Sequence, residues 1–142
     1  MTKVNFYVNL ADRRAFMVRL IRRVLAEGQL LFVHLADETA ARRFDEWLWT
    51  FDEQAFIPHC LVTEAIAAET PIQIGWPESP VPEHHAVLLN LAPDVPAAFA
   101  RFEKLLELVG TDDTDKQTGR QRYRFYKDRG YPLETFDMAE RA

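Results

Sequence analysis

The stretch VNFYVNLADRRAFMVRLIRRVLAEGQLLFVHL (residues 4–35) decides the fold. Its first seven residues alternate and are rich in β-formers, which predicts a strand at 4–10. Residues 13–27 place apolar side chains on one helical stripe, and Gly28 stands where the glycine that ends a helix is expected. The near-continuous apolar run at 30–35 is typical of a strand buried on both faces of a parallel sheet. The order strand, helix, strand indicates an α/β fold.

The alternation of strands and helices continues along the chain. Asp37 is positioned to cap a second helix at 38–49, and further strands are expected at 71–76 and 86–91. The periodicity of 96–109, which ends at Gly110, predicts an amphipathic helix. Residues 50–70 and the proline-rich stretch 77–83 are expected to be irregular. We therefore expect one domain (1–142), a three-layer open α/β sheet, mostly parallel, with helices on both faces.

Length and composition indicate a single globular domain. The chain has 142 residues, of which 48% are hydrophobic, and its net charge is −5. Its apolar runs are far too short to span a bilayer, and the N-terminus does not resemble a signal peptide. A single cysteine, Cys60, excludes an intramolecular disulfide. Together these features predict a cytoplasmic protein without a membrane partner.

The segment KQTGRQRYRFYKDR (residues 116–129) is strongly basic. It holds six basic residues and one acidic residue, whereas the rest of the chain carries −10. In a helix, Lys116, Arg120, Tyr123 and Lys127 fall on one stripe, with an aromatic ring between cations. A basic stripe on an acidic protein suits a carboxylate or a short acidic peptide better than bare nucleic acid. A solvated basic face on a terminal helix remains the alternative.

Motifs for nucleotide binding and for metal binding are missing from the sequence. The glycines are too scattered for a phosphate loop. His84 and His85 are adjacent in extended chain, and His59 and Cys60 have no second ligand at suitable spacing. Cys60 also lacks a group that would orient His59 as a base, which favours a buried thiol over a nucleophile. We expect no catalytic residues, no metal and no cofactor.

Three further features of the sequence need an explanation. Three aspartates after Gly110 are typical of a helix cap and first turn rather than of a metal cluster: Asp112, Asp113 and Asp115. Trp49 lies on a different side of its helix from Trp47, so it is expected to be partly exposed and is a candidate contact for a partner. The apolar loop that contains Phe56 is either an interface or packed against its own core, and the sequence leaves both open.

Four segments resemble one known family in the same order along the chain. RRFDEWLWTFDEQAFIPHCL (42–61) and PIQIGWPE (71–78) are similar to characteristic segments of the chi subunit of the bacterial DNA polymerase III holoenzyme. FYVNL near the N-terminus and KQTGRQRYRFYKDRGYPL near the C-terminus complete the resemblance, which covers residues 6–133. Gly119, inside an expected helix, is a departure that costs about 1 kcal/mol relative to alanine.

The resemblance implies a non-catalytic accessory subunit with an α/β, Rossmann-like fold that binds no nucleotide. Family members bind the acidic C-terminal tail of single-stranded-DNA-binding protein, which ends in a carboxylate after a phenylalanine, and they pair with the psi subunit of the clamp-loader complex. They also associate with a repair helicase and reach DNA only indirectly. Position by position, the resemblance assigns the tail site to Trp49, Val109, Lys116, Arg120 and Tyr123. It assigns the psi-facing surface to Phe56, Pro58, Trp76 and Pro77.

Two other classes of function remain open from the residues alone. One is an α/β enzyme with an unrecognised site, which a pocket lined by perturbed carboxylates would favour. The other is a direct binder of single-stranded nucleic acid through residues 120–129, which tight binding to bare oligonucleotide would favour.

Overall fold

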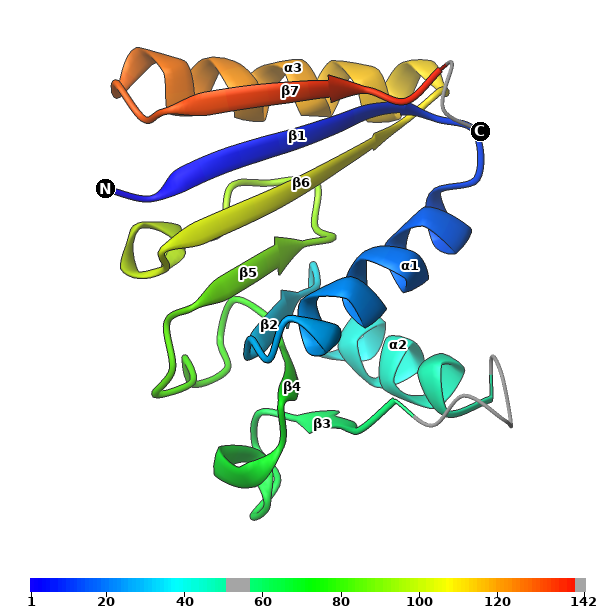
Figure 1. Cartoon of the computed structure of the whole chain (residues 1–142), viewed down its shortest axis with the longest axis vertical. Helices are drawn as coiled ribbons and strands as arrows, with labels where there is room; N and C mark the ends of the chain where they lie inside the picture. The colour runs from blue at the N-terminus through cyan, green and yellow to red at the C-terminus, as the bar shows by residue number, and fades with distance from the viewer. Residues whose placement is uncertain (51–56, 140–142) are drawn as a thin grey trace.

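The computed structural model describes residues 1–50 and 57–139, and its centre is one seven-stranded sheet (Figure 1). The strands lie in the order β3-β4-β2-β5-β6-β1-β7, and every adjacent pair among the described residues is parallel. The strands are β1 (Lys3–Leu10), β2 (Leu31–His34), β3 (His59–Leu61), β4 (Ile72–Gly75), β5 (Val87–Asn90), β6 (Lys104–Gly110) and β7 (Leu133–Asp137).

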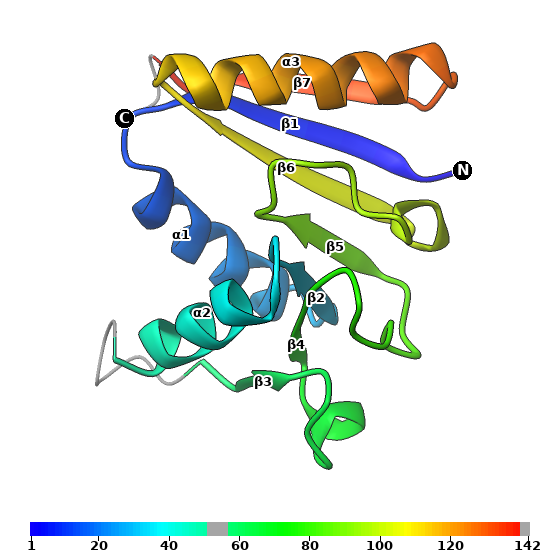
Figure 2. The same cartoon turned by 180° about the vertical axis from the view of Figure 1, so that it is seen from behind.

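Helices cover both faces of this sheet, which confirms the predicted three-layer architecture. Viewed from either side, α3 (Asp113–Asp128) runs along β1 and β7, whereas α1 (Arg13–Ala26) and α2 (Glu38–Thr50) lie towards the other strands (Figure 2). Short 3-10 helices occur at η1 (Ala67–Glu69) and η2 (Phe99–Arg101). Alternate residues of β6 enter two separate cores, one with α1 and α2 and one with α3 and η2.

Aspartate caps are observed at α1, α2 and α3, and those at α2 and α3 were predicted. The carboxylates of Asp12, Asp37 and Asp112 each accept a hydrogen bond from the backbone N–H three residues later. Gly28 follows the end of α1 with φ of 73°, a left-handed conformation that glycine adopts without strain. The first four expected elements therefore occur within a residue or so of their predicted bounds.

The helix predicted at 96–109 is wrong. Only η2 is helical there, and residues 104–110 form strand β6 between β5 and β1. The sequence KLLELVG is rich in helix formers, but its apolar side chains fill both cores, so tertiary burial overrides local propensity. The strands β3 and β7 at the two edges of the sheet were not predicted at all. No described helix is long and apolar enough to cross a membrane.

Candidate functional site

A pocket of about 350 Å³ lies between α3 and the strands β1, β6 and β7. It contains four of the five residues that the resemblance assigned to the tail site, and among the described residues Lys116 and Arg120 are the charged side chains that line it. We call it the α3 pocket, and its lining residues are Phe6, Val8, Asn9, Val109, Lys116, Gly119, Arg120, Tyr123 and Thr135.

The walls of the α3 pocket come from the alternation of side chains along β1. Phe6 and Val8 point to the α3 side, and the ring of Tyr123 meets Phe6 edge-on at a centroid distance of 5.3 Å. The pairing of β1 with β6 shifts register between Tyr7 and Leu10, where Asn9 has φ of 58°. Asparagine tolerates this left-handed conformation, and the irregularity brings Asn9 to the pocket.

Gly119 lets α3 approach the sheet at this pocket. A Cβ atom at this position would lie 2.8 Å from Cγ2 of Val109, closer than two carbon atoms can pack. The glycine inside α3 is therefore explained by a close approach between helix and strand. Sequence reasoning missed this role because Val109 was assigned to a helix rather than to a strand beneath α3.

Lys116 and Arg120 are available to a ligand at this pocket. Among the described residues, none forms an ion pair or a side-chain hydrogen bond with either cation. Arg120 is exposed and Lys116 is half-buried. Two unpaired cations beside the rings of Phe6 and Tyr123 fit a ligand with one negative and one apolar group.

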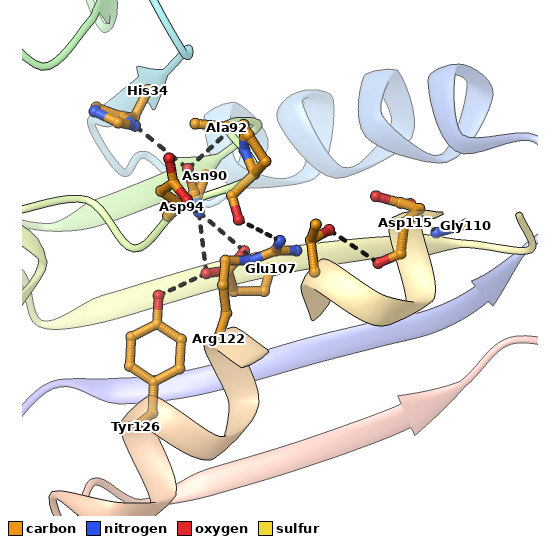
Figure 3. Close-up of polar contacts among 11 residues, drawn as sticks. His34, Asn90, Ala92, Asp94, Glu107, Gly110, Asp115, Arg122 and Tyr126 are labelled. Atoms are coloured by element: carbon orange, nitrogen blue, oxygen red, sulfur yellow. Dashed lines mark hydrogen bonds and ion pairs between the residues drawn. The ribbon is translucent and has the colours of Figure 1, made fainter. Parts of the chain in front are cut away.

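Arg122 belongs to the same basic segment but has a different role (Figure 3). Its side chain is 3% exposed, and its Nε donates to Oε1 of Glu107 at 3.0 Å. Glu107 also accepts hydrogen bonds from the Tyr126 hydroxyl at 2.6 Å and from the Asn90 amide at 3.1 Å. Complete burial raises the pKa of Glu107, and the nearby Arg122 opposes that rise. These contacts fix α3 on the sheet.

Trp49 is not brought to the α3 pocket. It lies near the end of α2, is 46% exposed, and its ring centroid is 4.1 Å from that of His59 on β3. Strands β3 and β1 are five inter-strand spacings apart, which at about 4.8 Å each amounts to roughly 24 Å. The tail-site assignment therefore divides into four residues at the α3 pocket and one near the opposite edge of the sheet.

Comparison with known proteins places the chain in a family. The model of the family "DNA polymerase III chi subunit, HolC" matches residues 1–134. The chain belongs to the DNA polymerase III chi subunit family. The chi subunit of Pseudomonas aeruginosa is 36% identical over 138 residues, which cover 94% of this chain and 95% of that protein. The chi subunit of Escherichia coli is 27% identical, with 95% of this chain and 97% of that protein covered.

Membership of the chi family identifies an accessory subunit in DNA replication that is itself non-catalytic. The chi subunit of Haemophilus influenzae, 32% identical over 76% of this chain and 75% of that protein, agrees with this assignment. The resemblance found in the sequence is therefore confirmed for the family and for the replication role.

The psi-facing residues that the chi resemblance assigned do not share one environment. Phe56 lies outside the described residues. Pro58 is half-buried and precedes His59, on which Trp49 packs. Trp76 is only 8% exposed and belongs to the core under α1 and α2, whereas Pro77 is exposed. Of the described members, Pro58 and Pro77 thus offer more surface to a partner than Trp76 does.

The surroundings of His59 and Cys60 in this chi-family chain indicate structural roles for both side chains. The His59 ring is completely buried, and its nitrogens lie 2.6 and 3.0 Å from the carbonyl oxygens of Ile57 and Asp45. Burial raises the pKa of the Cys60 thiol, which disfavours the reactive thiolate. The described residues contain no group of three or more His, Cys, Asp or Glu that could hold a metal ion.

The end of the sheet where related folds bind nucleotides is lined with carboxylates. Strands β1 and β6 are neighbours, and the helices that follow them, α1 and α3, leave to opposite faces, the point at which open α/β sheets bind ligands. Asp12 and Asp112 cap the two helices there, and Asp115 accepts a hydrogen bond from the Gly110 N–H. These carboxylates accept hydrogen bonds from backbone N–H groups that a bound phosphate would need, and their negative charge would repel a phosphate.

Proposed function

We propose that the α3 pocket binds the acidic C-terminal tail of single-stranded-DNA-binding protein. The observation that carries this proposal is the pair of unpaired cations, Lys116 and Arg120, beside an apolar pocket walled by Phe6, Val109 and Tyr123. A peptide that ends in a phenylalanine and a free carboxylate has the complementary arrangement of charge and apolar surface.

The chemistry of binding follows from these side chains. Arg120 or Lys116 holds the terminal carboxylate through charge-assisted hydrogen bonds. The phenylalanine ring enters between Val109 and Tyr123, where edge-to-face contact with aromatic rings is favourable. So small an interface gives reversible binding in the micromolar range, and the basic face of α3 makes the association rate sensitive to salt.

We further propose that a second partner, the psi subunit, binds near the opposite edge of the sheet. Trp49 is exposed there and Pro58 is close to it in the chain that follows α2. The other residues assigned to this surface are Pro77, the largely buried Trp76 and, outside the described residues, Phe56. Because this edge is about five strand spacings from β1, both partners can bind at once, and the subunit then bridges the clamp loader to coated DNA in the cytoplasm. A repair helicase is a further candidate for the Trp49 surface.

A titration with a tail peptide tests the proposal. A fluorescently labelled peptide with several aspartates and a C-terminal phenylalanine should bind the wild-type chain. Arg120→Ala should weaken binding by about tenfold or more, because a charge-assisted contact contributes roughly 1.5–3 kcal/mol. Arg124→Ala is the matched control, since Arg124 is exposed on α3 but does not line the pocket.

Two results would remove the proposal. One is equal affinity of the wild-type chain and Arg120→Ala for the peptide. The other is submicromolar binding to a bare oligonucleotide at about 0.15 M salt, since that requires several phosphate contacts that survive screening. The second result would favour a direct role in binding nucleic acid.

A further inference from the structure

A second cavity, of about 380 Å³, lies on the other face of β1, between α1 and the strands β1, β6 and β7. We call it the α1 cavity. Asn5 and Tyr7 of β1 line it, whereas Phe6 and Val8 line the α3 pocket. Because neighbouring residues of a strand point to opposite faces, the two cavities share β1 but have no described lining residue in common. A ligand of one therefore contacts different residues from a ligand of the other.

Asn5 places an unused hydrogen-bond acceptor at the α1 cavity. The residue is 4% exposed, and its Oδ1 is buried with no hydrogen-bond partner among the described residues. Asn5 and Tyr7 lie on the same face of β1; burial raises the pKa of the Tyr7 phenol, and a side-chain hydrogen bond with Asn5 lowers it. Buried polar atoms in native proteins are almost always paired, so this oxygen points to a missing donor.

Aromatic rings form one side of the α1 cavity. Tyr7 stacks on Phe136 with a centroid distance of 5.0 Å and an interplanar angle of 15°, and it meets Phe16 at 5.1 Å. All three rings are half-buried. Partly exposed rings around a cavity offer contact area to another planar ring.

The charged residues at the α1 cavity leave two cations uncompensated. Lys3 pairs with Glu134 at 3.4 Å, and Arg23 pairs with Glu27 at 3.3 Å. Arg19 lies over the Phe16 ring at 5.9 Å, and no described carboxylate pairs with it or with Lys104. The cavity therefore has a net positive charge around an aromatic wall and a buried acceptor.

We propose that the α1 cavity binds an acidic peptide segment of a partner protein that inserts a tyrosine side chain. The hydroxyl of the inserted tyrosine donates to Oδ1 of Asn5, and the ring of that tyrosine packs against Tyr7 and Phe16. Carboxylates that flank the tyrosine pair with Lys104 and Arg19. A site with a buried acceptor discriminates strongly against a ligand that lacks the donor, so this cavity selects tyrosine over phenylalanine, in contrast to the apolar α3 pocket.

Calorimetric titration with two capped peptides, acetyl-Asp-Asp-Tyr-Asp-Asp-amide and its phenylalanine analogue, tests this inference. The wild-type chain should bind the tyrosine peptide about tenfold or more tightly. Asn5→Leu should abolish this preference and should fold with similar stability, because the lost hydrogen bond with Tyr7 is offset by removal of a buried oxygen that has no donor. Lys104→Gln, at a half-buried residue, should weaken both peptides to a similar extent.

Arg120→Ala separates this inference from the proposed tail site. That variant should bind the tyrosine peptide as the wild-type chain does, because Arg120 does not line the α1 cavity. Equal affinity of the wild-type chain for both peptides would overturn the inference. So would a tyrosine preference that is lost in Arg120→Ala but kept in Lys104→Gln, since the peptide would then occupy the α3 pocket.

Discussion

Arg122 and Glu107 form an ion pair that is shielded from solvent, with Nε 3.0 Å from Oε1 and side-chain exposures of 3% and 0%. The pair joins α3 to β6, the strand beneath it, and the Tyr126 hydroxyl and the Asn90 amide supply further donors to the carboxylate. A buried pair of this kind stabilises the fold only while both partners are present, because either charge alone would be desolvated without compensation.

Removing one member of this pair is expected to destabilise the chain strongly. Arg122→Ala should lower the free energy of unfolding by about 3–5 kcal/mol, because it leaves the Glu107 carboxylate without its cation. Urea denaturation followed by circular dichroism measures the change. Arg124→Ala, on the exposed side of the same helix, should change the stability by less than about 0.5 kcal/mol. Similar losses in the two variants would contradict the structural role of the pair.

Gly119→Ala is expected to destabilise the chain although alanine favours helices. The new Cβ would lie 2.8 Å from Val109 Cγ2, and overpacking of this kind costs about 1–3 kcal/mol, more than the gain of about 1 kcal/mol in helix propensity. The variant should also bind the tail peptide more weakly, since α3 must move away from β6. Adding Val109→Ala should recover part of the stability, and a stabilised single variant would show that α3 does not approach β6 so closely.

His34 is expected to make the fold sensitive to mild acid. Burial lowers its pKa below the ordinary 6.5, and its Nδ1 lies 3.3 Å from Oδ1 of Asn90. The unfolded chain then takes up a proton at a higher pH than the folded chain, so stability is complete above pH 6.5 and is lost as the pH falls below it. The slope for this one group is at most about 1.4 kcal/mol per pH unit.

Denaturation curves at about pH 5.5 and about pH 7.5 test this dependence. His34→Gln should reduce the difference in stability between the two conditions. The remaining difference includes His84, whose pKa burial also lowers. Gln121→Ala, at an exposed position that carries no ionisable group, is the control and should leave the difference unchanged. An unchanged pH dependence in His34→Gln would exclude His34 as its source.

Trp49→Ala should separate the two proposed partner surfaces. Because Trp49 is near β3 and does not line the α3 pocket, the variant should bind the tail peptide with wild-type affinity but should fail to co-purify with the psi subunit. Tyr123→Ala should show the reverse pattern, with weakened peptide binding and intact co-purification. A large loss of peptide affinity in Trp49→Ala would contradict this separation and would show that Trp49 contributes to tail binding.

The elements that could be predicted are those in which the apolar residues follow the spacing of one kind of secondary structure. The N-terminal strand, helix and strand each have a single buried face or a fully buried run, and aspartate caps mark the helix starts. Strand β6 could not be predicted in this way, because both of its faces are buried and its leucines and glutamate also fit a helix. Strand β7 is an exposed edge with almost no apolar pattern.

The candidate site was predicted in part for similar reasons. Lys116, Arg120 and Tyr123 lie at helical spacing, so a helical stripe found in the sequence becomes a wall of the pocket. Arg122 lies in the same basic run yet is buried, and its partner Glu107 is recognisable only once β6 is known to be a strand. The separation of Trp49 from this helix depends on the order of strands in the sheet, which local patterns do not encode.

The α3 pocket is assembled from the two ends of the polypeptide. Phe6 and Val8 come from the first strand, and Val109, Tyr123 and Thr135 come from the last third of the chain. During synthesis on the ribosome, β1 cannot pair with either of its neighbours in the sheet until β6 and β7 have been synthesised. A nascent chain that stops short of residue 104 would therefore contain the α2 surface with Trp49 but no α3 pocket, so a ligand of that pocket could bind only after β6, α3 and β7 have been made.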